Sequence, residues 1–525
     1  MIKISNIRYD IKSREEDLEE YVKTKYGILD IQSFSISKKS VDARKKDDVH
    51  YVYSVVISCK NEKQLIKKHK SISKFVKKEY VFPQMPKSEK PIIIAGFGPA
   101  GMLCALTLAQ NGHRVIVIER GKCVEERKQD VENFSNNGII DENSNVQFGE
   151  GGAGTFSDGK LNTGINDTRI DKVFWEFYTH GAPKEILYYS KPHIGTDNLF
   201  NMVRNIREDI IQLGGEIRFL TTLTDIEVVD NKLNAVIVNG NERIEADALV
   251  LATGHSARDT FRMLKRHSID MEKKTFSIGA RIEHKQEMIN KSMYGNAWEC
   301  LENASYKLNT KSKSGRGVYT FCMCPGGEVI ASASSKNTVV TNGMSNFARD
   351  GENANAAVLV NVYPEDFDDN DVLSGMYFQE EIEKRGFVMG GEDYSAVCET
   401  VGHLYGGENK TDITPTYKPS IKWGRISDVL PDYAVSAIKE ALPEFNKKLK
   451  GFMDKNAVLT VPETRSSSPV RILRDESYQA SISGIYPCGE GAGYAGGITS
   501  AAVDGIRIAE AVVKQNGKKM DFSEQ

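Results

Sequence analysis

Three glycines with Gly-x-Gly-x-x-Gly spacing, Gly96, Gly98 and Gly101, have the pattern of a turn that binds the phosphates of a dinucleotide. An apolar run (residues 91–95) precedes the turn and a helical stretch (residues 102–112) follows it, as in a buried parallel strand leading into a helix. The first glycine permits the tight turn, the second lets the backbone approach a pyrophosphate, and the third lets helix and strand pack closely. The free N–H groups and positive dipole of the helix N-terminus favour the same anion.

A second apolar strand, residues 113–118, ends at Glu119, whose carboxylate is placed to accept hydrogen bonds from an adenosine ribose. Three glycines alone are weak evidence for a dinucleotide site. The ordered set of strand, turn, helix, second strand and acidic residue is far more specific. We therefore predict a dinucleotide site at this turn, and we include the neighbouring Pro99, Ala100 and Arg120 in it.

A second glycine-rich unit follows far along the chain. The segment GIYPCGEGAGYAGGITSAA (residues 484–502) combines a strand, an acidic turn and a helix opened by glycines. By itself this pattern also suits an ordinary closing strand and helix of a parallel sheet. Together with Ala252, Thr253 and Gly254, which follow another apolar strand, it resembles the flavoproteins with two dinucleotide-binding folds, the glutathione-reductase-like superfamily.

The resemblance implies that the dinucleotide is FAD. It assigns Glu490 to the ribityl chain and directs the helix that begins at Gly497 and Ile498 toward the flavin pyrimidine ring. A helix N-terminus stabilises the anionic reduced flavin, which agrees with this placement. The resemblance also implies cofactor contacts at Gly489, Gly496 and the three residues 252–254.

The stretch 145–161 is rich in glycine and small hydroxyl residues without a helix or strand period, which suits backbone that wraps around a ligand. We expect cofactor contacts at Gly152, Thr155 and Ser157; a flexible surface loop is the alternative. Five segments follow one another in this order: QFGEGGAGTFSDGKL, VLATGHSARD, FSIGARIEH, PETRSSSPVRILRD and the closing segment. Together they resemble a bacterial family of uncharacterised FAD-dependent dehydrogenases, or NAD(P)/FAD-dependent oxidoreductases. That family carries an N-terminal ferredoxin-like extension, so the resemblance spans essentially all 525 residues.

Three arginines, Arg465, Arg471 and Arg474, lie shortly before the closing segment and could clamp a carboxylate or phosphate of the substrate. Glu463 and Asp475 offer the alternative of ordinary ion pairs. If none of the arginines binds substrate, the substrate site is expected around residues 149–161.

The cysteines and histidines give no catalytic assignment. Cys322 and Cys324 would share one face of a strand, and we interpret both, like Cys488, as packing residues. His255 is nearest the cofactor motifs and is expected to neighbour the cofactor; neither it nor His284 nor His403 is assigned as an acid or base. No cysteine spacing indicates a metal site, and the scattered thiols indicate a reducing, cytoplasmic location.

The charge distribution is uneven. The whole chain has a net charge of −3, but residues 1–90 hold 18 Lys and 3 Arg against 13 acidic residues. This basic part could bind RNA or a protein partner, or it could be a solvated lysine-rich face. No apolar run is long enough to span a membrane, and the N-terminus lacks the apolar core of a signal peptide.

The order of patterns in residues 1–86 is β-α-β-β-α-β, which predicts a ferredoxin-like α+β domain. Its expected elements are strands at 2–9, 31–37, 50–59 and 80–82 and a helix at about 62–78. A further helix begins at a capping box of Ser13 and Glu16 and runs to about Lys25, where Gly27 ends it. Residues 83–91 are expected to be a linker.

The predicted fold class is α/β, with a Rossmann-like FAD-binding fold in residues 91–270 and 481–525. A mixed α+β substrate or cap domain (271–480) is inserted in it, with strands expected within 276–284, 316–324, 328–335 and 356–362. The expected function is that of an FAD-dependent oxidoreductase that transfers hydride through flavin to or from an anionic small molecule. The alternatives are a flavoprotein that modifies RNA or binds a partner through its basic N-terminal domain. Since the chain has no second Gly-x-Gly-x-x-Gly motif, NAD(P)H would bind only transiently as electron donor.

Overall fold

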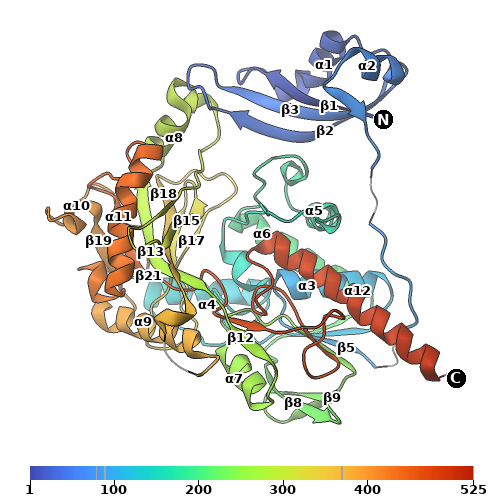
Figure 1. Ribbon diagram of the computed structural model, residues 1–525, viewed down its shortest axis with the longest axis vertical. Helices are drawn as coiled ribbons and strands as arrows, with labels where there is room; N and C mark the ends of the chain where they lie inside the picture. The colour runs from blue at the N-terminus through green and yellow to red at the C-terminus, as the bar shows by residue number, and fades with distance from the viewer. Residues whose placement is uncertain (78–79, 88–89, 368–369, 524–525) are drawn as a thin grey trace.

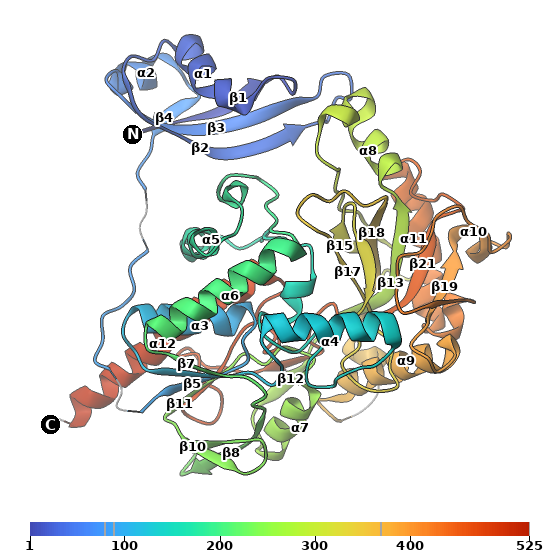
Figure 2. The same cartoon turned by 180° about the vertical axis from the view of Figure 1, so that it is seen from behind.

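The computed structural model describes residues 1–77, 80–87, 90–367 and 370–523, and Figures 1 and 2 show three parts. The N-terminal α+β domain arches over a parallel α/β domain, and a third domain with a long mixed sheet lies beside both. The chain enters and leaves the third domain through two short strands, β12 (Met271–Lys273) and β22 (Val470–Ile472), which pair with each other. Both connections therefore run through one narrow ribbon.

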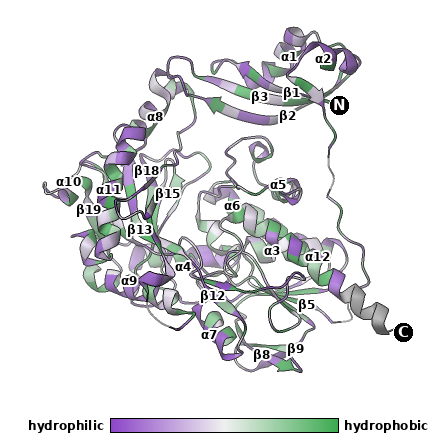
Figure 3. Cartoon of the chain, in the orientation of Figure 1, coloured by the Kyte–Doolittle hydropathy of each residue, from purple (hydrophilic) through white to green (hydrophobic). Residues whose placement is uncertain are grey.

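The N-terminal domain has the element order that the sequence predicts. Its sheet has the order β2-β3-β1-β4 and every neighbouring pair is antiparallel, which is the arrangement of a split βαβ fold. Its elements are β1 (Ile2–Tyr9), α1 (Leu18–Tyr26), β2 (Ile31–Asp42), β3 (His50–Cys59), α2 (Glu62–Lys68) and β4 (Ile72–Lys74). Gly27 ends α1 in the left-handed conformation, as expected. Hydrophilic residues are frequent on α1 and α2 (Figure 3).

Two elements of this domain differ from the sequence-based expectation. The first helical turn, η1 (Glu15–Asp17), begins beyond Ser13, and Arg14 holds the cap position without a side-chain hydrogen bond. The second helix ends at Lys68, because His69 is extended and residues 72–74 then pair with β1 as the last strand. The expected end of that helix, Lys78, lies outside the described residues.

The parallel α/β domain is built on a five-stranded sheet in the order β23-β11-β5-β6-β7. Its strands are β5 (Ile92–Ala95), β6 (Val115–Ile118), β7 (Glu216–Arg218), β11 (Ala248–Leu251) and β23 (Ile485–Pro487). Helices α3 (Pro99–Gln110), α6 (Thr196–Gln212) and α12 (Ile498–Ser523) lie together on one face (Figures 1 and 2). The strands are apolar throughout because Ile92 and Ile94 pack against these helices while Ile93 and Ala95 pack on the opposite side.

A small antiparallel sheet covers the opposite face of the parallel sheet. It consists of β8 (Leu223–Val229), β9 (Lys232–Val238) and β10 (Glu242–Glu245), and its apolar residues share a core with Ile93 and Leu249. Other helices of this domain are α4 (Val124–Asn137), α5 (Arg169–Thr179) and α7 (Arg258–Arg266), with 3-10 turns η2 (Gly152–Phe156) and η3 (Lys184–Leu187).

The inserted domain contains a seven-stranded sheet in the order β14-β15-β18-β13-β21-β19-β20, in which only the β19–β20 pair is parallel. Its strands are β13 (Phe276–Lys285), β14 (Asn309–Lys311), β15 (Gly317–Cys324), β18 (Asn353–Val362), β19 (Ala396–Thr400), β20 (Ile421–Trp423) and β21 (Val458–Glu463). A hairpin of β16 (Glu328–Ala331) and β17 (Thr341–Met344) accompanies the sheet. The helices are α8 (Gln286–Tyr294), α9 (Ser374–Gly390), α10 (Val401–Leu404) and α11 (Asp432–Lys448), with turns η4 (Gly295–Cys300), η5 (Pro364–Asp366) and η6 (Ile426–Asp428). The strands expected near 276, 316, 328 and 356 are all present.

The segment that precedes β5 packs on the α/β domain rather than acting as a free tether. Phe82 is buried in the core beneath α3, and the Tyr80 hydroxyl donates a hydrogen bond to Glu510. Residues 80–82 are therefore not the last strand of the N-terminal domain. Within the expected linker, Ser88 and Glu89 lie outside the described residues, and residues 83–87 have no helix or strand.

This packing predicts that the position of an N-terminal truncation matters. Deletion of residues 1–77 is expected to leave a folded, FAD-loaded protein, whereas deletion of residues 1–86 also removes Tyr80 and Phe82. Loss of a buried phenylalanine costs about 3–5 kcal/mol, so the shorter protein should melt at a lower temperature. Thermal melts and flavin content of the two truncations provide the measurement; equal melting temperatures would contradict the role of Phe82.

Candidate active site

The Gly-rich turn between β5 and α3 has the geometry that the sequence predicts. Gly96 has φ +99°, and a Cβ atom there would overlap the carbonyl of Ala252, the residue that follows the neighbouring β11. A Cβ at Gly101 would overlap the carbonyl oxygen of Gly96, so close packing of α3 requires this glycine. Gly98 occupies the N-cap of α3, Pro99 follows, and no side chain caps the helix. The N-terminal amides of α3 are thus open to a ligand.

Glu119 is buried at the end of β6 and fixes the backbone around the turn. Its Oε2 accepts a hydrogen bond from Phe97 N at 2.8 Å, and its Oε1 accepts from Gly121 N and Gly149 N at 3.0 Å each. A carboxylate offers about four acceptor positions, so Glu119 retains capacity for a ribose hydroxyl. The same side chain lines the pocket described next.

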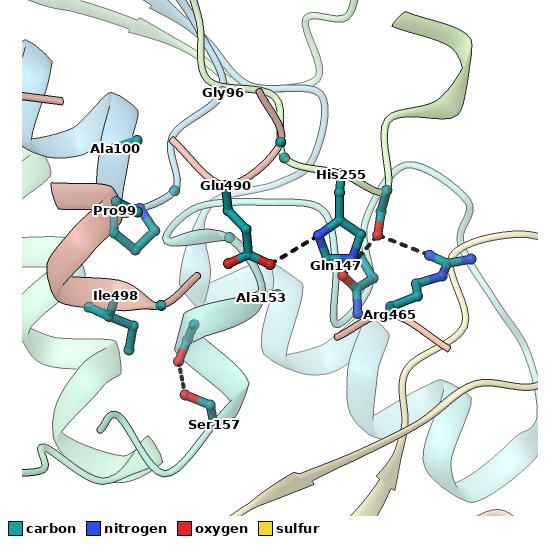
Figure 4. A pocket seen from close by; sticks show the side chains of 18 of the residues that line it. Gly96, Pro99, Ala100, Gln147, Ala153, Ser157, His255, Arg465, Glu490 and Ile498 are labelled. Atoms are coloured by element: carbon teal, nitrogen blue, oxygen red, sulfur yellow. Dashed lines mark hydrogen bonds and ion pairs between the residues drawn. The ribbon is translucent and has the colours of Figure 1, made fainter. Parts of the chain in front are cut away.

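A pocket opens at the carboxyl ends of β5, β6, β11 and β23, which is where parallel α/β sheets bind their ligands (Figure 4). Most of the predicted cofactor residues line it together: Gly96, Gly98, Pro99, Ala100, Glu119, Gly152, Ser157, Ala252, Thr253, Gly254, Glu490, Gly496, Gly497 and Ile498. The remaining four predicted residues, Gly101, Arg120, Thr155 and Gly489, are outside its lining.

Gly101 permits the close packing of α3 described above, and the other three residues contact segments next to the pocket. Arg120 forms an ion pair with Asp259 and lies over the Phe148 ring, and the Thr155 hydroxyl donates to Glu150 O at 3.3 Å. Gly489 has φ +76°, and its amide donates to Asp504 Oδ2 at 2.8 Å.

The loop 145–161 is ordered by a residue that sequence reasoning missed. Arg127 on α4 is fully buried and donates hydrogen bonds to three loop carbonyls, those of Asn145, Val146 and Glu150, at 2.6–2.9 Å. Burial lowers the pKa of Arg127 to about 10. A Cβ at Gly149 would overlap the Arg127 side chain, so glycine is required there. The loop therefore has a fixed conformation and forms one wall of the pocket.

Glu490 and His255 form a pair inside the pocket. His255 Nδ1 lies 3.2 Å from Glu490 Oε1, as the dashed line in Figure 4 shows. His255 Nε2 is buried and has no hydrogen-bond partner among the described residues. The pair thus presents the partly exposed Glu490 carboxylate to a ligand, and His255 neighbours the predicted cofactor contacts as the sequence suggested.

The three arginines proposed as an anion clamp have different surroundings. Arg465 lines the pocket, where its guanidinium binds Glu383 through Nε at 3.0 Å and Nη2 at 2.9 Å and donates to Ser256 and Ser334. Arg471 pairs with Glu272 near the surface, and Arg474 pairs with Asp504 and donates to Pro487 O. Arg471 and Arg474 are outside the pocket lining, so we retain the clamp hypothesis for Arg465 only.

The inserted domain closes the pocket on the side opposite α3. Its contribution includes Phe321, Cys322, Asn342, Glu463 and Ser466, and the loop residue Lys160 faces the same side. Lys160 Nζ donates to Met323 O and lies 3.2 Å from Asp158 Oδ2. Burial is the largest influence and would lower the pKa of Lys160, but Asp158, Cys324 and Cys322 together outweigh it and the pKa is raised, so the ammonium stays charged.

Cys322 corrects the interpretation that both cysteines of this strand are packing residues. A β-bulge lies between Phe321 and Cys324, and Cys322 has φ +44°, which breaks the alternation of side chains. Cys322 consequently lines the pocket, whereas Cys324 is buried and burial raises its pKa to about 11. Cys488 is buried in the core at the inner edge of the pocket.

The other two histidines lie outside the pocket lining. His284 bonds Phe452 O through Nε2, and burial lowers its pKa to about 4; His403 Nδ1 lies 2.7 Å from Glu399.

The pocket has the features that FAD requires. Gly98 and Gly152 approach so closely that a Cβ at Gly152 would lie 3.1 Å from Gly98 Cα, which leaves a cradle without side chains for a pyrophosphate. The N-termini of α3 and α12 both open into the pocket and favour anions. Unused acceptor positions of Glu119, and the Glu490–His255 pair, would hold the ribose and ribityl hydroxyls.

Three stretches of the chain match known protein families. Residues 90–293 match the family described as pyridine nucleotide-disulphide oxidoreductase, and residues 275–466 match the family described as FAD-dependent protein, C-terminal domain-like. Residues 1–58 match a domain of unknown function. Among solved structures, the flavin-dependent brominase Bmp2 is 14% identical over 81% of this chain and 79% of its own, with a TM-score of 0.38. L-proline dehydrogenase from P. horikoshii is 14% identical over 82% of this chain and 95% of its own, with a TM-score of 0.33.

A relative from Clostridium beijerinckii, described as an uncharacterized protein, is 45% identical over 534 residues and covers 98% of this chain and 99% of the relative. Among the residues that the structure describes, no helix is both long and apolar enough to cross a membrane. The chain belongs to the same family as this relative, its domain matches identify it as an FAD-dependent oxidoreductase, and FAD is its cofactor.

Proposed function

We propose that the protein transfers a hydride equivalent between FAD and an anionic small molecule that binds against the inserted domain. The observation that carries this proposal is that two cations, Arg465 and Lys160, line the pocket beside carboxylates that each of them shares with another cation. In one cluster, buried Glu383 binds both Arg258 and Arg465, and Glu380 binds Arg258 and Arg262. In a second cluster, Asp158 binds both Lys160 and Arg349.

In the second cluster two cations share one carboxylate, whereas in the first the buried Arg258 and Arg465 are matched by Glu383 and Glu380, and the third cation, Arg262, is exposed. Burial lowers the pKa of Arg465, although Glu383 opposes the shift. An anionic substrate would add the negative charge that the second cluster lacks. The remaining carboxylate of this wall, Glu463, is neutralised by the buried Arg281 at 2.6 Å.

The roles of the chain follow from this arrangement. FAD supplies the two-electron chemistry when bound. The loop 145–161 and the inserted sheet enclose the pocket against water, Arg465 and Lys160 orient the anion, and Lys160, with Asp158 beside it, can hold a proton for the substrate at Nζ. The cysteines described are free thiols, which supports a reducing, cytoplasmic location as part of the proposal.

The experiment is anaerobic reduction of the bound flavin by a panel of carboxylates, phosphate esters and NAD(P)H, followed by reoxidation with unsaturated acids. Absorbance changes with carboxylates or phosphate esters and none with matched neutral amides are expected. Equal or faster reaction with the neutral compounds would refute the anionic substrate.

Replacement of Arg465 by Lys is expected to lower kcat/KM by about tenfold or more, since a charged hydrogen bond contributes about 1.5–3 kcal/mol. Lysine keeps the charge but cannot bind Glu383 through two nitrogens and also reach the two serines, so the cation is no longer held in position for the anion. FAD content should stay near that of the wild type because the predicted ribose and pyrophosphate contacts come from other residues. Arg471→Lys is the matched control, since Arg471 lies outside the pocket, and it should leave the kinetics unchanged. Equal kcat/KM values for the two variants would end the clamp hypothesis.

A further inference from the structure

A second cavity, of about 380 Å³, lies where the N-terminal domain meets the other two domains. All three parts contribute side chains to its lining: Lys39 and Tyr51, Tyr189 and Lys191, and Tyr294 and Arg349. Figures 1 and 2 show the hairpin end of β2 and β3 beside α8, which is the corner where the cavity lies.

The N-terminal domain is held over this cavity by specific bonds. Lys39 N donates to Tyr188 O at 2.7 Å, and Ser190 N donates to Lys39 O at 2.8 Å, so β2 bonds to the segment after η3. The Tyr188 hydroxyl donates to Glu15 at 2.9 Å, and Lys39 Nζ lies 2.6 Å from the same carboxylate. The cavity is therefore enclosed by a fixed domain interface.

Four cations (Lys39, Arg44, Lys191 and Arg349) line the cavity with one carboxylate, Glu302, which accepts a hydrogen bond from the Tyr189 hydroxyl at 2.9 Å, so the lining as a whole favours an oxyanion. Lys191 donates to Ser305 Oγ at 3.3 Å, and no carboxylate of the described residues lies within ion-pair distance of it. Desolvation and the nearby Arg349 lower the pKa of Lys191, as expected for two cations that lack an anion between them. The hydroxyls of Tyr51 and Tyr294 have no hydrogen-bond partner in the described part of the chain, and both can donate to an anion.

The aromatic rings give the cavity an apolar side. Lys39 Nζ lies 4.8 Å from the Tyr51 ring centroid and 4.9 Å from that of Tyr189, so these rings are fixed around it. Tyr294 and Met293 complete an aromatic and thioether wall. Such a wall suits a planar ring, and the basic groups suit the phosphate or carboxylate attached to it.

We propose that this cavity is a regulatory binding site for a small planar-ring anion, distinct from the flavin pocket. Arg349 connects the two sites. It lines the cavity, and its Nε lies 2.8 Å from Oδ1 of Asp158, which lines the flavin pocket and pairs with Lys160. An anion that binds Arg349 competes with Asp158 for the guanidinium. The ion pair between Arg349 and Asp158 then weakens, and the Asp158 carboxylate interacts more strongly with Lys160. The site gives the N-terminal domain a role that requires neither RNA nor a protein partner.

The test is titration calorimetry of the full-length, FAD-loaded protein with three probes: inorganic phosphate, ADP and 4-hydroxybenzoate. ADP or 4-hydroxybenzoate should bind saturably and more tightly than phosphate, and the preferred probe tells whether the oxyanion is a phosphate or a carboxylate. Lys191→Met should weaken binding about tenfold or more, since it removes a charged partner. Lys184→Met, an exposed lysine of the same segment outside the cavity, should have no effect.

Two further readouts separate this site from the flavin pocket. Probe binding should persist in Arg465→Lys and should shift the flavin absorbance or the rate of flavin reduction, whereas Lys191→Met should remove that shift. The proposal is overturned if no probe binds below about 10 mM, if Lys191→Met binds like the wild type, if Arg465→Lys abolishes binding, or if binding leaves the flavin signal unchanged. Because calorimetry needs no turnover, failure to find an anionic substrate would leave this result standing.

Discussion

Replacement of Gly98 by tryptophan is expected to abolish FAD binding while the protein remains folded. Gly98 has φ −78°, which any residue adopts, and a Cβ atom there would meet nothing closer than Gly152 Cα at 3.8 Å. The fold therefore tolerates a side chain at this position. The indole, however, would fill the cradle between the first turn and the loop 145–161, which a pyrophosphate needs. Purified protein should be colourless, with wild-type circular dichroism, and heat should release no FAD.

Two neighbouring variants make this result specific. Gly98→Ala adds only the Cβ and should retain the fold with weakened FAD affinity. Gly101→Ala should instead destabilise the protein, because its Cβ overlaps the Gly96 carbonyl even without cofactor. A Gly98→Trp protein that carries one FAD per chain would show that the pyrophosphate lies elsewhere.

Replacement of Glu383 by glutamine is expected to cost about 3–5 kcal/mol of unfolding free energy, because it leaves buried arginines without their carboxylate. Glu383 is fully buried; its oxygens accept from Arg258 at 2.9 Å and from Arg465 at 2.9–3.0 Å. The Thr464 hydroxyl also donates to it at 2.8 Å. Denaturant unfolding of the two proteins measures the difference. Since Arg465 lines the flavin pocket, substrate kinetics should deteriorate as well.

The control for this variant is Glu272→Gln, which breaks the surface pair with Arg471 and should cost less than about 1 kcal/mol. The pH dependence adds a second check. Burial alone would raise the pKa of Glu383, but the two arginines hold it well below its ordinary 4.5. A lowered carboxyl pKa stabilises the fold above that ordinary value and loses this effect only as the pH falls toward the folded-state value. The gap between wild type and Glu383→Gln should therefore be constant near neutrality and shrink below about pH 4.5. Equal losses of unfolding free energy in Glu383→Gln and Glu272→Gln would contradict the stabilising role of the buried cluster.

Sequence reasoning predicted the parts of the site that depend on local backbone geometry. The turn at Gly96, the helix that opens at Ile498 and the acidic ends at Glu119 and Glu490 each follow from short patterns in which glycine conformation and helix polarity decide the structure. Parallel strands place their carboxyl ends at one edge, so these separate motifs had to meet there. The order of elements in the N-terminal domain was predictable for the same reason, since strand alternation and the glycine that ends α1 are local signals.

Contacts between distant segments could not be predicted in this way. Arg127 lies on a charged helix, where an arginine is ordinarily exposed, and only the fold shows that it binds three loop carbonyls. The partner of Arg465 is Glu383 on α9, which no spacing rule connects to it. The bulge that brings Cys322 into the pocket depends on its pairing with β18, which a single strand does not reveal. Phe82 was assigned to the wrong domain because an isolated apolar triplet does not indicate which core it joins.

The arrangement of the parallel sheet also determines when the cofactor site can form during synthesis. Strand β5 leaves the ribosome early, but its sheet is completed only by β23, and α12 must follow to close the pocket. At about 5–20 residues per second, the interval between Ala95 and Ile485 lasts roughly 20–80 s. During this time the inserted domain can fold, while the turn at Gly96–Gly101 still lacks β23 and the N-terminus of α12. The nascent chain should therefore acquire FAD only after the residues beyond 498 have emerged, and a ribosome stalled before that point should carry no flavin.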